Sequence, residues 1–238
     1  MADEGTSSTE IAAAAAADEA EAEPAVVVVG EQFAATEAVD LTVIRYDVLT
    51  FMDVDLYRVL DADGNVLFKV NRVIFNSRLV LLDAAGKTLL TMKKDQSGGL
   101  RGMDLNFYKQ WNVFRGKGKN PSDLLFSIRK CSLLESDKFK VRLAANTDRA
   151  ATCDFMINGN GRSTKCTISI GQSDTIIAQM HCKRAFLQPS KLLVTVNPNI
   201  DCVFIVSLLT ILEELRRSSQ GITSSVLNLG LDLANDLS

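Results

Sequence analysis

The sequence predicts a mainly β protein whose antiparallel strands close into a barrel around one buried, hydrophobic C-terminal helix. From about residue 41, some dozen short strand-like segments follow one another with turn residues between them, a spacing typical of a barrel or a sandwich. After them comes Ile200–Leu215, IDCVFIVSLLTILEEL, whose apolar residues cover the full circumference of a helix. A barrel wide enough to hold this helix would bury it and remove the strand edges.

The start and the length of the helix favour a buried core element over a membrane span. Asn197-Pro198-Asn199 supplies turn residues before it, and Asp201 places a negative charge where it suits the helix dipole. The uninterrupted apolar part, Cys202–Leu212, is shorter than the roughly 20 residues that cross a bilayer. We therefore interpret it as enclosed by strands, with a membrane span as the alternative, and expect Glu213 and Glu214 to mark its emergence into water.

The strand segments show turn chemistry and alternation. Leu56–Leu60 and Val66–Val70 flank Asp63-Gly64, and Asp-Gly between alternating apolar residues is a strong hairpin signal. In Phe139–Leu143 the odd-numbered residues are apolar, whereas Lys138, Lys140 and Arg142 alternate with them. Successive strand side chains point to opposite faces, so this segment has one buried and one basic face.

Composition divides the chain into three parts. Residues 1–25 are an acidic, alanine-rich tail that we expect to be disordered, residues 26–217 form the barrel domain, and residues 218–238 are a polar C-terminal tail. Five scattered cysteines without a CxxC pair indicate reduced thiols. No secretory signal is visible at the N-terminus. We expect a cytoplasmic protein, with a peripheral membrane or a nuclear position as alternatives.

Signals of catalysis are poor. The single histidine, His181, neighbours Cys182, but adjacent strand side chains point to opposite faces, so the two cannot form a nucleophile and base pair. The sequence contains no GxSxG elbow, no P-loop and no EF-hand spacing. We therefore expect no enzyme, no cofactor and no metal site.

Charge is unevenly distributed. Residues 1–64 hold 15 acidic and 2 basic residues, whereas residues 93–142 hold 12 basic and 5 acidic. The overall pI of about 5.3 argues against a dedicated nucleic-acid-binding protein. Basic side chains contact phosphate oxygens well, so the basic middle is a candidate site for an anionic headgroup; the alternative is an ordinary solvated surface. The candidate residues are Lys93, Lys94, Arg115, Lys117, Lys119, Arg129 and Lys130.

The order of several segments identifies a resemblance. QWNVFRG (110–116), LLFSIRK (124–130) and KLLVTVNPNIDCVFIVSLLTILEEL (191–215), preceded by the hairpin segments at 57–70 and 79–94, resemble the plant LURP-one-related proteins. That family is similar in fold to the C-terminal domain of tubby proteins and to phospholipid scramblases. The resemblance implies a closed barrel of about twelve strands around a central hydrophobic helix. It also implies phosphoinositide headgroup binding, as in tubby-like domains, and a link to plant defence.

Together these observations predict a non-enzymatic, tubby-like binding or tethering module that recognises anionic phospholipid headgroups in plant defence signalling. The alternative is a protein–protein interaction module in defence signalling that binds no lipid and has an unknown protein partner. A third hypothesis, lipid scrambling, lacks a membrane span and a calcium motif in this sequence.

Overall fold

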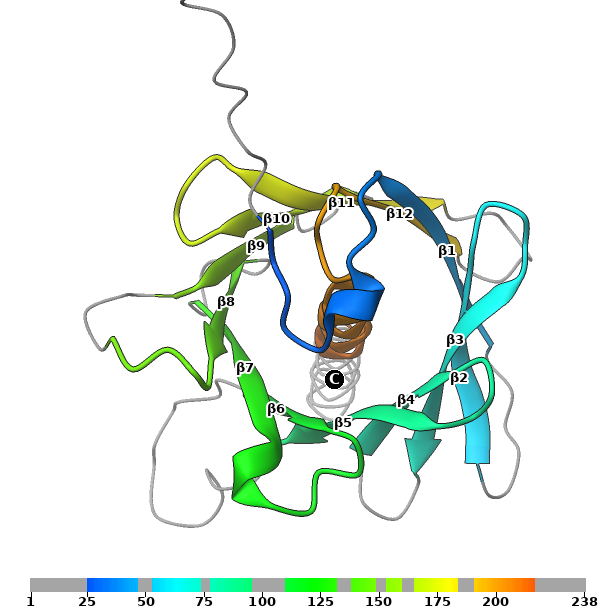
Figure 1. Ribbon diagram of the computed structural model, residues 1–238, viewed down its shortest axis with the longest axis horizontal. Helices are drawn as coiled ribbons and strands as arrows, with labels where there is room; N and C mark the ends of the chain where they lie inside the picture. Colours follow the sequence, from blue (N-terminus) through cyan, green and yellow to red (C-terminus); the bar gives the residue numbers. More distant parts are fainter. Residues whose placement is uncertain are drawn as a thin grey trace, which may run out of the picture.

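The computed structural model describes residues 25–46, 53–73, 78–95, 110–131, 138–148, 153–159, 165–183 and 191–216. Within these ranges twelve strands form one closed antiparallel barrel around a single helix (Figure 1). The predicted tails, residues 1–25 and 218–238, lie outside the described residues except for Ala25. The strands are β1 (Val39–Arg45), β2 (Asp53–Leu60), β3 (Val66–Val73), β4 (Arg78–Asp83), β5 (Thr88–Lys94), β6 (Trp111–Arg115), β7 (Leu124–Lys130), β8 (Lys138–Leu143), β9 (Phe155–Gly159), β10 (Lys165–Ile170), β11 (Ile176–Lys183) and β12 (Lys191–Val196).

Each strand pairs with the next along the chain, and β1 closes the barrel by pairing with β12 as well as with β2. The direction of the strands therefore alternates around the barrel. Even-numbered strands run toward the end at which the helix begins, here called the helix-start end, and odd-numbered strands run away from it. The 3-10 helices η1 (Glu31–Phe33) and η3 (Pro121–Asp123) lie in segments at the helix-start end.

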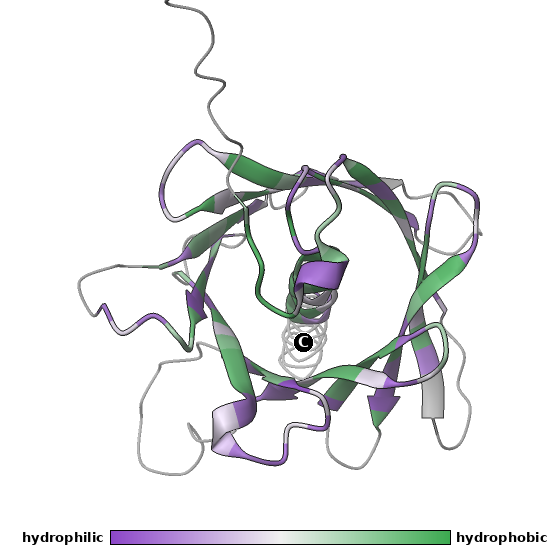
Figure 2. Ribbon diagram, viewed as in Figure 1, coloured by the Kyte–Doolittle hydropathy of each residue, from purple (hydrophilic) through white to green (hydrophobic). Residues whose placement is uncertain are grey.

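The central helix, residues 202–216, fills the barrel. Its side chains from Val203 to Leu212 are all buried, so the predicted enclosure by strands is confirmed. Twelve strands give the room, because a barrel of about eight strands is already filled by its own side chains. Figure 2 shows the hydrophobic colour of this helix in the middle of the barrel.

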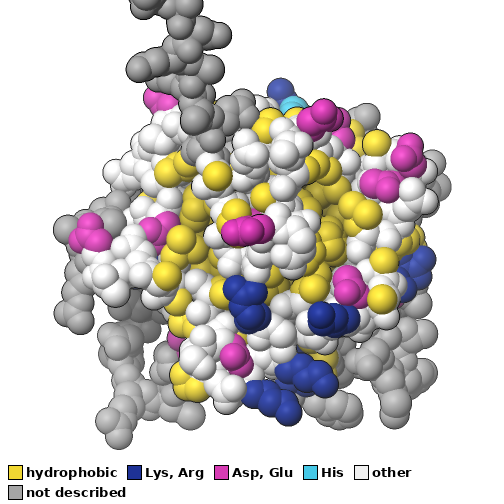
Figure 3. All heavy atoms as spheres, viewed as in Figure 1, with side chains coloured by type: hydrophobic (Ala, Val, Ile, Leu, Met, Phe, Trp, Pro, Cys, Tyr) yellow, Lys and Arg dark blue, Asp and Glu magenta, His cyan; other side chains and the backbone are white. Residues whose placement is uncertain are grey.

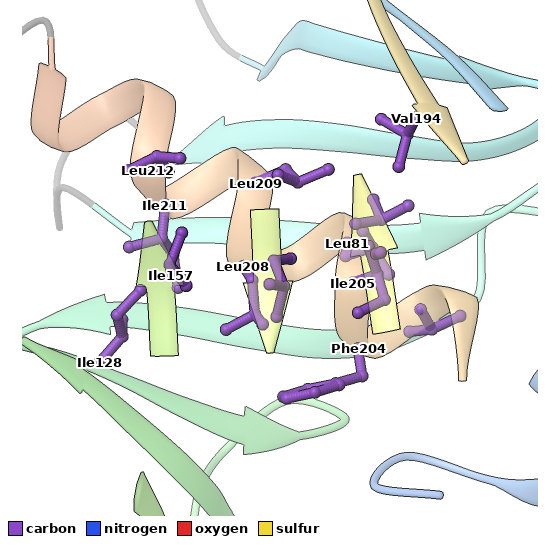
Figure 4. Packing of buried hydrophobic residues seen from close by; sticks show 14 of the residues in the cluster. Leu81, Ile128, Ile157, Val194, Phe204, Ile205, Leu208, Leu209, Ile211 and Leu212 are labelled. Atoms are coloured by element: carbon purple, nitrogen blue, oxygen red, sulfur yellow. The ribbon is translucent and has the colours of Figure 1, made fainter. Parts of the chain in front are cut away.

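The helix packs on the barrel wall in all directions. In Figure 4, Phe204, Ile205 and Leu209 point away from the helix axis to different sides, toward side chains of the surrounding strands. The Phe204 ring lies 5.1 Å from that of Phe126 on β7 and 5.0 Å from that of Phe155 on β9. Such edge-on and tilted aromatic pairs add to the free energy gained from burial.

Two hydroxyl groups interrupt the apolar surface of the helix without leaving unsatisfied donors. The Ser207 hydroxyl donates to the carbonyl of Phe204 at 2.7 Å, and the Thr210 hydroxyl donates to the carbonyl of Val206 at 2.8 Å. Because each finds its acceptor one turn back in the same helix, both can be buried at little cost.

The predicted Asp-Gly hairpin is confirmed between β2 and β3. Gly64 has φ +87°, a conformation that glycine adopts readily. Asp61 accepts hydrogen bonds from the side chain and the backbone N–H of Asn65, and these bonds hold the pKa of Asp61 below its usual range. The turn thereby fixes the register of the two strands.

Candidate functional site

A buried carboxylate organises the helix-start end. Asp201 is fully buried. One of its oxygens, Oδ1, accepts the Phe204 N–H at 3.1 Å and caps the helix. The other, Oδ2, accepts the N–H groups of Val28, Val29 and Gly30 at 3.3, 2.6 and 3.1 Å. A single side chain therefore ties the N-terminal segment to the helix across more than 170 residues of sequence.

The N-terminal segment of residues 26–34 lies across the mouth of the barrel (Figure 1). Val26 bridges Ile200 and Ala34 bridges Asp201 through backbone pairing. On the other side, the Arg115 guanidinium donates to the carbonyls of Val29 and Val28 at 2.5 and 3.4 Å. The backbone N–H groups of this segment therefore donate to the Asp201 carboxylate, and its backbone carbonyls accept from the Arg115 guanidinium.

The loop after β6 folds back over the outer face of β5. The Thr91 hydroxyl donates to the Gly116 carbonyl at 2.7 Å, and Lys93 Nζ donates to the Gly118 carbonyl at 2.6 Å. Gly118 has φ +56°, and a Cβ there would lie 2.6 Å from the Cβ of Phe114, so the close approach requires glycine. Lys93 Nζ also lies 4.7 Å from the centre of the Phe114 ring.

The structure separates the seven predicted cations into three groups. Arg115, Lys117 and Lys119 lie together at the helix-start end, in β6 and the loop after it, and all three are exposed. Lys93 and Arg129 alternate with buried strand residues and face outward from the wall. Lys94 and Lys130 end β5 and β7 at the opposite end of the barrel, on the strand face of the buried Met92 and Ile128. Only the first group forms a compact set of exposed cations.

Other basic residues of the same wall were not among the predicted site residues. Lys140 lies opposite Arg129, and Arg142 lies opposite Ser127, all outside the barrel. Arg78 on β4 lies opposite Lys93 in the same way. The alternation of Lys138, Lys140 and Arg142 was the available signal, but pairing partners depend on the register between strands, which the sequence does not display.

At the opposite end, an ion pair joins the helix to the wall. The Glu214 carboxylate pairs with Arg72 of β3, and the Tyr57 hydroxyl lies 3.5 Å from Glu214 Oε1. Glu213 and Glu214 are the first helix residues after Leu212 that are not fully buried. The Glu214 side chain is only 12% exposed, and Arg72 compensates its charge at the rim. Burial, with the nearby Glu214 carboxylate, raises the pKa of Tyr57 well above its usual range.

The described residues contain few groups suited to catalysis. His181 is exposed on β11. Burial, together with the neighbouring Asp201 carboxylate, raises the pKa of the Cys202 thiol to about 12. This thiol stays protonated at neutral pH and is a poor nucleophile. In the described ranges no three His, Cys, Asp or Glu side chains group as metal ligands would, and no helix there is both long and apolar enough to cross a membrane.

A twelve-stranded antiparallel barrel that encloses one hydrophobic helix defines the class of this protein. The sequence model of the LURP-one-related family matches residues 39–213. Protein LURP-one-related 10 of Arabidopsis thaliana is 33% identical over 80% of this chain and 96% of its own length. Protein LURP1 of the same plant is 33% identical over 81% of this chain and 91% of its own.

A solved structure agrees with these matches. An X-ray structure of a protein from Arabidopsis thaliana is similar with a TM-score of 0.60 and 32% sequence identity, covering 79% of this chain and 98% of that chain. The chain therefore belongs to the LURP-one-related family, and the predicted membership is confirmed.

Proposed function

We propose that this protein is a non-enzymatic binding module that attaches to anionic phospholipid headgroups, such as phosphoinositides, through the helix-start end of its barrel. The observation that carries the proposal is a group of exposed cations beside an exposed apolar side chain. Arg115 contacts the backbone of Val28 and Val29, so it lies next to Val27, which is 47% exposed. A peripheral membrane site combines cations, which contact lipid phosphates, with an apolar side chain that enters the membrane interface. This group of residues has both.

The charges at the helix-start end indicate which part of it would contact the membrane. Figure 3 views the helix-start end and shows Lys and Arg side chains gathered in its lower part, over the loop between β6 and β7, with hydrophobic side chains nearer the centre. Glu31, Asp63 and Asp174 lie in other segments at this end, and the one acidic residue of the β6–β7 loop, Asp123, accepts a hydrogen bond from the Asn120 backbone N–H. A membrane would therefore approach from the side of the β6–β7 loop, where Arg115, Lys117 and Lys119 face it.

The lack of enzymatic activity is part of the proposal. The chain has one histidine, which is exposed on β11, and the Cys202 thiol is held protonated by burial. Asp201 and Arg115 form hydrogen bonds with backbone groups of residues 28–30, which hold the barrel mouth together. These contacts favour a structural and binding role for the charged residues of this end.

Vesicle co-sedimentation tests the proposal. The full chain should sediment with phosphatidylcholine vesicles that contain phosphatidylinositol phosphates and stay in solution with phosphatidylcholine alone. Each surface cation contributes about 1 kcal/mol, so Lys117→Glu with Lys119→Glu should lower the partition coefficient roughly thirtyfold or more. Raising the salt concentration should weaken the wild-type binding, because exposed charges are screened.

The matched control is Lys165→Glu with Lys191→Glu, which makes the same charge change at the first residues of β10 and β12, at the opposite end of the barrel. This control should retain most of the wild-type binding. Equal loss in both variants would reduce the effect to net charge and contradict a local site. No binding by the wild type at low salt would instead favour the alternative, a protein–protein interaction module in plant defence signalling.

A further inference from the structure

The wall formed by β5 to β8 is free of acidic residues. These four strands hold eight basic residues and neither Asp nor Glu. Arg129, Lys140 and Arg142 alternate with buried core residues such as Ile128 and Val141, so they face outward. This outward set, together with Lys138, is here called the basic wall. It is separate from the cations at the barrel mouth that carry the lipid proposal.

The register of the strands places like charges against each other. Arg129 lies directly opposite Lys140, and two residues along the same face Ser127 lies opposite Arg142. Arg78 and Lys93 form a second pair of like charges on the neighbouring strands β4 and β5. Like charges directly across an antiparallel pair destabilise a sheet. A polyanion lying on the basic wall would relieve this repulsion.

The N-terminal segment of the same chain is acidic, so its charge is opposite in sign to that of the basic wall. Residues 1–24 contain seven acidic residues and no basic ones. Three of them, Glu19, Glu21 and Glu23, alternate with alanine. In an extended segment such residues share one side at a spacing of about 6.6–7 Å, which is also the spacing of Lys138, Lys140 and Arg142 along β8.

The attachment point lets the segment reach the wall. Val26 is held at the helix-start end by its pairing with Ile200, and β8 runs toward that same end, with Arg142 near its last residue. Glu19, Glu21 and Glu23 come seven, five and three residues before Val26, so an extended chain carries them at most about 25, 18 and 11 Å from it. Short tethers of this kind give effective concentrations in the millimolar range, so weak individual ion pairs are sufficient.

We propose that the acidic N-terminal segment of this chain binds the basic wall of β7 and β8 in the same molecule. The wall is then covered by default, and an outside polyanion must displace the segment to bind there. The inference does not depend on lipid binding, because it uses different side chains on a different face of the barrel.

Zero-length carbodiimide cross-linking of the full chain tests this contact, since the reagent joins a carboxylate to a lysine amine only when the two touch. Mapping by mass spectrometry should find Glu19, Glu21 or Glu23 joined mainly to Lys140 and Lys138. An equal mixture of unlabelled and nitrogen-15 chains identifies which cross-links form within one molecule. Lys69 on β3 and Lys191 on β12 serve as reference lysines on other parts of the wall.

Arg129→Glu with Arg142→Glu reverses the charge of the wall and keeps the reactive lysines. The yield on Lys140 should fall about tenfold, since several surface ion pairs change sign together. Circular dichroism checks that this variant is folded. Glu21→Gln with Glu23→Gln weakens the contact from the segment side, leaves the barrel untouched and keeps Glu19 as the reactive carboxylate, so the yield of the cross-link from Glu19 to Lys140 should fall. Cross-links spread evenly over Lys69, Lys191 and Lys140, yields unchanged by either variant, cross-links only between molecules, or none at all would each overturn the proposal.

Discussion

At the scale of single residues, Asp201 connects more of the structure than any sequence signal around it indicates. Its position predicts a favourable charge at the start of a helix, and the structure confirms that it caps the helix. The same carboxylate also binds three backbone amides of residues 28–30. Charge-assisted hydrogen bonds of this kind are stronger than neutral ones. Asp201 therefore stabilises the helix and the closed barrel mouth together.

We expect Asp201→Ala to lower the free energy of unfolding by about 3–5 kcal/mol, because it removes a helix cap and leaves buried amides without an acceptor. Urea denaturation measures the loss, and hydrogen exchange should become faster at Val28, Val29 and Gly30. Asp40→Ala is the matched control. Asp40 is exposed and accepts a hydrogen bond from Thr195, and such surface changes stay within about 0.5 kcal/mol. Similar losses in the two variants would contradict the role of Asp201.

At the scale of elements, the central helix and the strands stabilise each other, because each buries the apolar surface of the other. A helix that is apolar on every side is stable in water only when other elements surround it. The strands in turn present one apolar face each, and closure around the helix buries all twelve faces at once. Ile205 is fully buried within this arrangement. Its side chain points from the helix toward the wall (Figure 4).

We expect Ile205→Asp to prevent accumulation of folded, soluble protein, because an unpaired carboxylate in the barrel centre costs several kcal/mol. Ile205→Val is the matched control: it removes one methylene group and should cost about 0.5–1.5 kcal/mol. Expression level, circular dichroism and thermal unfolding measure both variants. A well-folded Ile205→Asp protein with near-normal stability would show that the helix is not enclosed.

At the scale of the whole molecule, the fold could be predicted from local patterns, since alternation marks strands and uniform apolarity marks the enclosed helix. Lys138–Leu143 is an example in which the pattern and the burial agree. The segment Val26–Val29 is the counterexample. It has the composition of a strand, yet it crosses the barrel mouth because Asp201 and Arg115, both distant in sequence, bind its backbone.

The candidate site was less predictable than the fold. Seven cations could be selected by charge, but their grouping depends on which strand ends meet at the same end of the barrel. Lys94 and Lys130 end strands that run away from the helix-start end. Lys93 faces outward but donates a hydrogen bond to the Gly118 carbonyl of its own molecule, because the loop at Gly118 folds back over β5. This fold-back requires a positive φ angle at Gly118. The distribution of charges along the sequence does not predict that angle.

The stability of the whole molecule should depend on pH through Tyr57, which links the wall to the end of the helix. Burial raises the pKa of Tyr57 in the folded protein, whereas an unfolded chain loses this proton near pH 10. Above about pH 10 the folded state therefore binds more protons than the unfolded state, and the free energy of unfolding falls as pH rises, by at most about 1.4 kcal/mol per pH unit for this group. The contribution is fully present below pH 10.

Tyr57→Phe keeps the buried ring and removes the titrating hydroxyl, so the variant should lose this part of the decline above pH 10. At neutral pH the loss should be about 1 kcal/mol or less, since the contact with Glu214 Oε1 is long at 3.5 Å. Urea unfolding from pH 8 to pH 11 measures the slopes, with Tyr46→Phe as the matched control that retains Tyr57. The same alkaline slope in the wild type and in Tyr57→Phe would show that the proton on Tyr57 does not couple to folding, and that another group produces the decline.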